Sequence, residues 1–273
     1  MKTRPGLEDD ALNGNPHLST DLFLFAHPDD DVFVAGTMSM LVKAGHTVHA
    51  AWLTSGDARG DPAMREAELC KAMRIVGVAE SGIHLLRLPN RGLLGILPTA
   101  AEKVAKIVVQ LNPERIFTTA YEGGHIDHDA LNFLTRMAYQ QTGSRAGLYE
   151  FPLYNRSGPF YFWWWRINTF YPCMEEVVYS RLTETAVRIK HLAMREYASQ
   201  WKDMLPFRLV LNKKRMLQTG EPYRQLPPDR DYTVPPHAGK LNYEGWSTSP
   251  TGTTFIDFRK AVADFCSEGN PRP

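Results

Sequence analysis

Histidines and aspartates gather directly after one of the apolar runs in this sequence. His27, Asp29, Asp30 and Asp31 lie in the segment AHPDDD, which follows the apolar run LFLF. Carboxylates this close repel one another unless positive charge lies among them. A bound cation would remove that repulsion, and imidazole nitrogen together with carboxylate oxygen suits a borderline divalent ion such as Zn²⁺.

A second group of the same kind occurs in the segment GGHIDHD. It contains His125, Asp127, His128 and Asp129, and it also follows a predicted strand. The carboxyl ends of parallel strands share one edge of a sheet, so we expect the two groups to meet although 101 residues separate His27 from His128.

The residue types assign different roles within this predicted site. His27 and Asp30 lie three positions apart in a loop that enters a helix, and His128 can supply a third ligand from the other loop. Two histidines and one carboxylate leave a position for water, as in catalytic zinc sites. Asp29 is then placed to take a proton from that water, and His125 to stabilise an oxyanion or protonate a leaving amine.

Asp127 is expected to orient one of the histidines from behind the ligands. A simpler interpretation of HPDD is a helix N-terminus, with one aspartate as the cap and its neighbours favoured by the helix dipole. That interpretation accounts for only one of the three carboxylates and assigns no role to His27, so the metal site is favoured.

The first half of the chain alternates strand-like runs with helical patterns. Strands are expected at residues 22–26, 47–53, 83–88 and 115–120, and helices at about 32–44, 63–76, 98–111 and 129–140. Strand followed by helix, four times over, predicts a Rossmann-like α/β fold with a mostly parallel sheet and helices on both faces.

The second half is less regular. A fifth strand is expected at residues 148–154 and a long helix at 182–201, and the segment after Gln218 is rich in proline and glycine, which predicts an irregular C-terminal elaboration. Domain boundaries follow: a polar arm over 1–19, the main domain over 20–217, and an extension over 218–273 packed on it. The aromatic run Phe160–Trp165 is expected to place at least one ring at a cleft or a subunit contact, which leaves a homo-oligomer open.

Composition narrows the range of partners and compartments. The 273 residues include 31 Lys and Arg against 30 Asp and Glu, a net charge of +1, which argues against nucleic acid or an anionic membrane as the principal partner. The three cysteines form no CxxC pattern. The polar N-terminus lacks a secretory signal, and no run approaches 18 apolar residues, so we expect a cytoplasmic protein without a membrane span.

The two histidine motifs resemble those of a known family. AHPDD after the first strand and a later GGHxDH are similar to the motifs of the zinc-dependent PIG-L/LmbE-like N-acetylglucosamine deacetylases, over roughly residues 20 to 200. Weaker similarities are the loop LTSGDARG and the segment YASQW at Tyr197–Trp201, whose side chains we expect to be packed. The sequence departs from the family at Asp31, commonly glutamate, and at Ile126, often proline; neither should hold the metal.

The resemblance implies a role for each matched residue. The three predicted ligands match the family's zinc ligands, and Asp29 matches its general base. His125 matches the histidine that steadies the tetrahedral intermediate, and Asp127 matches its partner. Arg65, in MREAE, corresponds to an arginine that contacts sugar hydroxyls, with a solvated helix arginine as the alternative.

The expected function is therefore metal-dependent hydrolysis of an N-acetyl group on an amino sugar or glycoconjugate of the N-acetylglucosamine type. Zinc is the expected cofactor, with another divalent cation left open. One alternative is an amidase that cleaves a larger N-acyl group or a thiol conjugate. An alternative of another class is a carbohydrate-binding protein that has lost catalysis, although every expected ligand and the base are present. A nucleotide-binding dehydrogenase would need GxGxxG where the chain has HPDDD.

Overall fold

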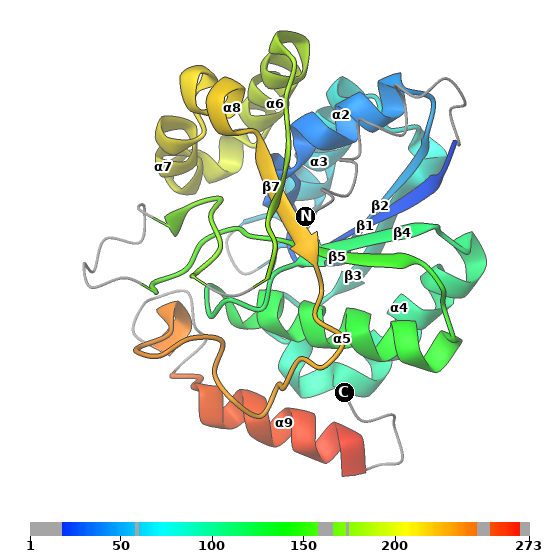
Figure 1. Ribbon diagram of the computed structural model, residues 1–273, viewed down its shortest axis with the longest axis vertical. Helices are drawn as coiled ribbons and strands as arrows, with labels where there is room; N and C mark the ends of the chain where they lie inside the picture. Colours follow the sequence, from blue (N-terminus) through cyan, green and yellow to red (C-terminus); the bar gives the residue numbers. More distant parts are fainter. Residues whose placement is uncertain (1–17, 58–59, 158–165, 173–174, 245–251, 268–273) are drawn as a thin grey trace.

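The structure of the protein, a computed structural model, describes residues 18–57, 60–157, 166–172, 175–244 and 252–267. The strands of these residues form one sheet between two layers of helices (Figure 1). Their order across the sheet is β3-β2-β1-β4-β5-β7-β6. The strand bounds are β1 Thr20–Phe25, β2 Thr47–Thr54, β3 Ile83–Leu88, β4 Arg115–Thr119, β5 Gly147–Phe151, β6 Val178–Ser180 and β7 Glu221–Gln225.

Strands β1 to β5 pair in parallel, whereas β7 runs antiparallel to both β5 and β6. The predicted Rossmann-like, mostly parallel α/β fold is confirmed. β1 lies at the centre, with β2 on one side and β4 on the other, so the order of the strands reverses between β1 and β4. Ligand sites of open α/β sheets lie at the carboxyl ends of strands at such a reversal.

Alternating side chains of β1 build the two halves of the core. Leu22 and Leu24 face the layer of α4, α5 and α9, whereas Phe23 and Phe25 face the layer of α2, α3 and α6. α7 and α8 extend this second layer. The helix bounds are α2 Ala35–Lys43, α3 Pro62–Val76, α4 Leu97–Leu111, α5 Ile126–Thr142, α6 Glu184–Glu196, α7 Trp201–Val210, α8 Lys213–Thr219 and α9 Phe255–Ser267.

The chain after Gln218 contains more regular structure than expected. β7 joins the sheet although Pro222 argues against a strand, because ionic partners of Glu221 and Arg224 hold it in place. In α9, Phe258 and Val262 are buried in the core at helical spacing, a signal that could have predicted this helix. The predicted boundary at residues 217 and 218 stays a prediction, although the residues after it complete the sheet.

Two other expectations concern the long helix and the aromatic run. The helix expected over 182–201 ends at Glu196, and Tyr197 turns the chain so that α7 follows as a separate helix. The run Phe160–Trp165 and most of the predicted N-terminal arm lie outside the described residues. Among the described residues, no helix combines the length and the hydrophobicity needed to cross a bilayer.

A buried ion pair fastens the turn after β1 to the second half of the chain. Lys190 of α6 donates to Glu221 Oε1 of β7 at 2.7 Å and to the carbonyl of Phe33 at 3.1 Å. Glu221 in turn accepts the backbone N–H groups of Gly36 (3.1 Å) and Thr37 (2.7 Å) at the start of α2. It therefore caps a helix that no side chain caps locally.

We predict that Lys190→Met lowers the free energy of unfolding by about 3–5 kcal/mol, because it leaves the charge of Glu221 buried without its cation. Urea denaturation followed by circular dichroism measures the change. Lys213→Met is the matched control, since it removes an exposed ion pair with Glu184 and should change little. Equal losses in the two variants would show that the buried pair does not anchor the turn.

Candidate metal centre at the carboxyl edge of the sheet

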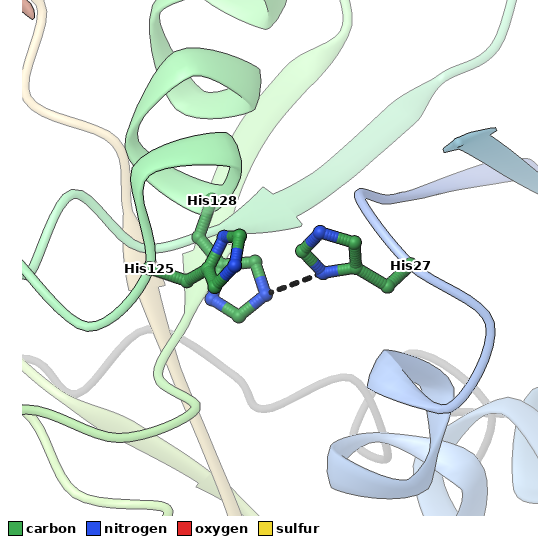
Figure 2. A group of neighbouring side chains, drawn as sticks. All are labelled: His27, His125 and His128. Carbon is green, nitrogen blue, oxygen red and sulfur yellow. Dashed lines mark hydrogen bonds between the residues drawn. The ribbon is translucent and has the colours of Figure 1, made fainter. Parts of the chain in front are cut away.

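The two predicted groups of residues meet where β1 and β4 end side by side. His27 follows β1, and His125 and His128 lie at the N-terminal end of α5, which follows β4. Figure 2 shows the three imidazoles converging, with His27 Nδ1 3.2 Å from His128 Nε2. All three are buried, and each offers a ligand atom within 4.8 Å of the others. This group can hold a metal ion.

Asp30 brings a carboxylate into the same cluster. Asp30 Oδ1 lies 3.1 Å from His128 Nε2, and Oδ2 lies 3.5 Å from His27 Nδ1. A tetrahedral ion with bonds of about 2.0–2.1 Å places its ligand atoms about 3.3–3.4 Å apart. The backbone N–H groups of Ala26 (3.1 Å) and His27 (2.8 Å) fix Oδ2. His27, Asp30 and His128 therefore lie about as far apart as the ligands of one ion, with a different oxygen of Asp30 facing each histidine.

Asp127 orients His27 from the side away from this cluster. Its Oδ2 accepts the Nε2 hydrogen of His27 at 3.1 Å and the backbone N–H of Arg91 at 2.6 Å, and its Oδ1 accepts the backbone N–H of Leu93 at 3.4 Å. With the proton on Nε2, His27 presents the lone pair of Nδ1 to Asp30 and His128. The carboxylate of Asp127 thus contacts His27, and only its backbone N–H reaches His125.

His125 differs from the other two histidines in its hydrogen bonding. It is the N-cap of α5, and its Nδ1 accepts the backbone N–H of Asp127 at 3.1 Å. The pKa of His125 lies well below its usual value, mainly because the ring is buried and also because His27 and His128 lie nearby. The neutral ring then carries its proton on Nε2, so His125 is suited to donate a hydrogen bond rather than a second lone pair.

Asp29 occupies a strained backbone position beside the cluster. Its φ is 105°, a left-handed conformation that is uncommon for residues other than glycine and often occurs at functional sites. Burial raises the pKa of Asp29 to about 7, while Arg65 opposes this shift and Asp30 adds to it. A carboxylate with such a pKa can accept a proton near neutral pH.

The cluster stabilises positive charge. Burial would lower the pKa of His27, but the carboxylates of Asp30 and Asp127 raise it to about 10. Burial would raise the pKa of Asp30, but His128 and His27 hold it well below its usual value. Both shifts express the attraction between the buried carboxylates and a cation, whether a proton or a metal ion provides the charge.

Arg65 lies against the loop that carries Asp29. The arginine side chain is only 4% exposed, so it is not a solvated helix arginine. Its Nη2 donates to the carbonyl of Pro28 and lies 3.2 Å from Asp29 Oδ2. Gly56 packs on the guanidinium, since a Cβ there would lie 3.0 Å from Arg65 Nε. Arg65 therefore contacts the candidate base directly.

The remaining aspartates of the two motifs support the loops. Asp31 is fully buried and accepts the hydroxyl hydrogen of Tyr197, so it faces α6 and not the histidines. Asp129 Oδ1 accepts the backbone N–H groups of Glu122 and Gly123, both at 3.1 Å. Gly123 has φ of +69°, the left-handed conformation that glycine adopts most easily.

Sequence reasoning missed Tyr154, which completes one wall of the site. Its ring centroid lies 5.6 Å from that of His128. The segment of Tyr154 is held by Glu122, which accepts the backbone N–H groups of Leu153 (2.7 Å) and Tyr154 (2.9 Å). A Cβ at Gly124 would collide with the carbonyl oxygen of Tyr154. No local pattern marks this tyrosine, because the contacts that place it are long-range.

The segment that carries both groups of site residues is similar to known proteins. Residues 22–139 match the PIG-L family, described as GlcNAc-PI de-N-acetylase. The chain is 30% identical over 132 residues to the probable N-acetylglucosaminyl-phosphatidylinositol de-N-acetylase of Schizosaccharomyces pombe, covering 45% of this chain and 53% of that protein. It is 32% identical over 126 residues to the probable N-acetyl-alpha-D-glucosaminyl L-malate deacetylase 2 of Bacillus cereus, covering 40% and 56%.

The chain spans about half the length of these curated relatives. A solved structure of a conserved protein from Thermus thermophilus is similar with a TM-score of 0.60 and 22% identity, over 80% of this chain and 98% of that one. This likeness shows a shared fold. The resemblance expected from the two motifs is confirmed: residues 22–139, which carry both groups of site residues, match the PIG-L family.

Proposed function

We propose that the protein is a metal-dependent hydrolase that removes the N-acetyl group from an amino sugar of the N-acetylglucosamine type. The observation that carries the proposal is the buried cluster of His27, Asp30 and His128, which lie at ligand spacing with Asp29 beside them. Both curated relatives are named for removal of an acetyl group from N-acetylglucosaminyl compounds, which supports the substrate class.

His27, Asp30 and His128 are the proposed ligands, and zinc is the proposed ion. Two imidazoles and one carboxylate form a donor set of catalytic zinc sites. When bound, such an ion acts as a Lewis acid and lowers the pKa of water. Asp127 would keep Nδ1 of His27 directed at the ion, as a carboxylate behind a ligating histidine does elsewhere.

The cytoplasmic location and the homo-oligomer stay predictions of the sequence.

Asp29 and His125 would take different parts in the acid–base catalysis. Asp29 accepts a proton from the attacking water as the new C–O bond forms on the acetamide carbonyl. His125, neutral and protonated on Nε2, donates a hydrogen bond to the oxygen that gains negative charge. The C–N bond then breaks, acetate leaves, and Asp29 or His125 supplies the proton that the departing amine requires.

A panel of N-acylated sugars tests this function. We expect acetate and free amine in equal amounts from N-acetylglucosamine compounds, and slower release from matched substrates with a longer acyl group. Faster cleavage of the longer acyl groups would favour the amidase alternative. If metal-loaded protein releases no carboxylic acid from any of the N-acylated sugars, the result would favour a binding protein without catalysis.

The ligand assignment predicts that single variants differ in metal content. Asp30→Asn and His128→Ala should each lose most of their metal on dialysis, whereas His125→Ala should retain it. Metal analysis of proteins with unchanged circular dichroism measures this. Loss of the ion in His125→Ala, with retention in Asp30→Asn, would instead indicate a site of three imidazoles.

The base assignment predicts that Asp29→Asn retains the metal but loses roughly 10²–10⁴-fold in kcat, because an amide cannot accept the proton. Steady-state assays of metal-loaded protein measure the loss. Asp31→Asn is the matched control, since Asp31 faces Tyr197, and it should retain far more activity. Turnover of Asp29→Asn at the wild-type rate would move the base to another residue.

We propose that Arg65 binds sugar hydroxyls, as the resemblance implies, and its contact with Asp29 offers a second role. Arg65→Ala should leave the metal in place and reduce kcat/KM on an N-acetylglucosamine substrate more than on a simple acetamide without the sugar. Equal slowing of both substrates would show instead that Arg65 acts through Asp29 alone. The comparison needs only the two substrates and metal-loaded protein.

A further inference from the structure

Exposed apolar side chains form a stripe along α7. Trp201, Leu205 and Leu209 are 56%, 49% and 65% exposed, and their spacing of four residues places them on one face of the helix. Met204 and Phe207 occupy the opposite face and are buried, with the ring of Phe207 packed on Phe33 at 5.0 Å. α7 therefore has one apolar face in the core and a second apolar face in solvent.

Cations border the exposed stripe. At 100° per residue, Lys202 and Arg208 fall on its two sides, and both are exposed. Lys202 Nζ lies 5.7 Å from the ring of Trp201, and Arg208 Nη2 donates to the carbonyl of Met194 at 3.0 Å. An apolar stripe between long cationic side chains is typical of helices that lie in the interface of a membrane.

The neighbouring helices extend the positive charge. Apart from Lys190, which is buried with Glu221, residues 181–219 contain eight Lys or Arg and three Asp or Glu, a net charge of +5 in a chain whose total is +1. A groove of about 490 Å³ on α6 is lined by Arg188, His191, Arg195 and Lys213, together with Glu184. Of these, Lys213 lies 3.5 Å from Glu184. The groove is therefore cationic overall.

This surface lies close to the candidate metal centre. The ring of Phe207 stacks on Tyr154 at 5.9 Å, and Tyr154 contacts His128 at 5.6 Å. Figure 1 shows α6, α7 and α8 grouped on one side of the molecule. These two ring contacts connect the buried face of α7 to the candidate metal centre, so a surface bound to the outer face of α7 would lie near the site.

We propose that the outer face of α7, with the cations of α6 and α8, docks on an anionic lipid surface. Trp201, Leu205 and Leu209 enter the boundary between headgroups and acyl chains, while the flanking cations contact lipid phosphates. A nucleic acid would match the charge but leaves the apolar stripe without a partner. A symmetric contact with a second copy would place this cationic face against itself, which is unfavourable. The docking is independent of the chemistry at the metal centre.

Sedimentation with vesicles tests the proposal. We expect the full chain to bind vesicles of phosphatidylcholine mixed with phosphatidylglycerol, to bind pure phosphatidylcholine more weakly, and to be released by salt. The double variants Leu205→Ser/Leu209→Ser and Lys202→Glu/Lys214→Glu should each weaken binding by roughly tenfold or more. Val109→Ser/Ile256→Ser and Lys106→Glu/Lys260→Glu, at exposed positions of α4 and α9, are the matched controls and should bind normally.

Three results would overturn the proposal. They are no binding to either vesicle, unchanged binding of the α7 variant, and self-association without lipid that the α7 variant abolishes, which would indicate a second copy as the partner. The same variants should hydrolyse a water-soluble N-acetylglucosamine compound at the wild-type rate, because none of the changed residues touches the metal centre. That assay separates failure of docking from failure of the proposed hydrolysis.

Discussion

Buried negative charge at the carboxyl ends of β1 and β4 is the constraint around which the rest of the structure is arranged. Asp30 and Asp127 lie almost wholly out of solvent, each hydrogen-bonded to His27 or His128 and to backbone N–H groups. The N-terminus of α5 adds favourable dipoles near Asp127. Arg65 places a guanidinium beside the third carboxylate, that of Asp29. The edge of the sheet is thus electrostatically prepared for a cation before any ligand enters.

Much of this arrangement could be predicted because it depends on local patterns. Strands β1 to β4 are short segments rich in apolar and β-branched residues, and the helices between them show regular spacing and recognisable ends. Once a parallel sheet is expected, the carboxyl-end rule brings together His27 and His128 without knowledge of any contact. The start of α5 was placed three residues too late, since its N-cap is His125, a residue type that rarely signals a helix start.

The features that could not be predicted depend on distant partners. Lys190, Glu221 and Tyr154 act on the site through contacts that span 31 or more residues of sequence, and nothing near them in the chain marks that role. The proline and glycine content after Gln218 predicted irregular structure, yet an ion pair of Glu221 holds the strand that contains Pro222 in the sheet. A total charge near zero also does not reveal where the charges lie, since Lys and Arg outnumber Asp and Glu by nine to three within residues 181–219.

The position of β4 in the sheet has a consequence for how the chain is made. β1 pairs with β2 soon after both emerge from the ribosome, but its other edge stays unpaired until residues 115–119 have been synthesised. During that interval the segment LFLF presents free backbone donors and acceptors between apolar side chains, the kind of edge that recruits other strands. We therefore expect nascent chains interrupted before β4 to be prone to aggregate through this unpaired edge.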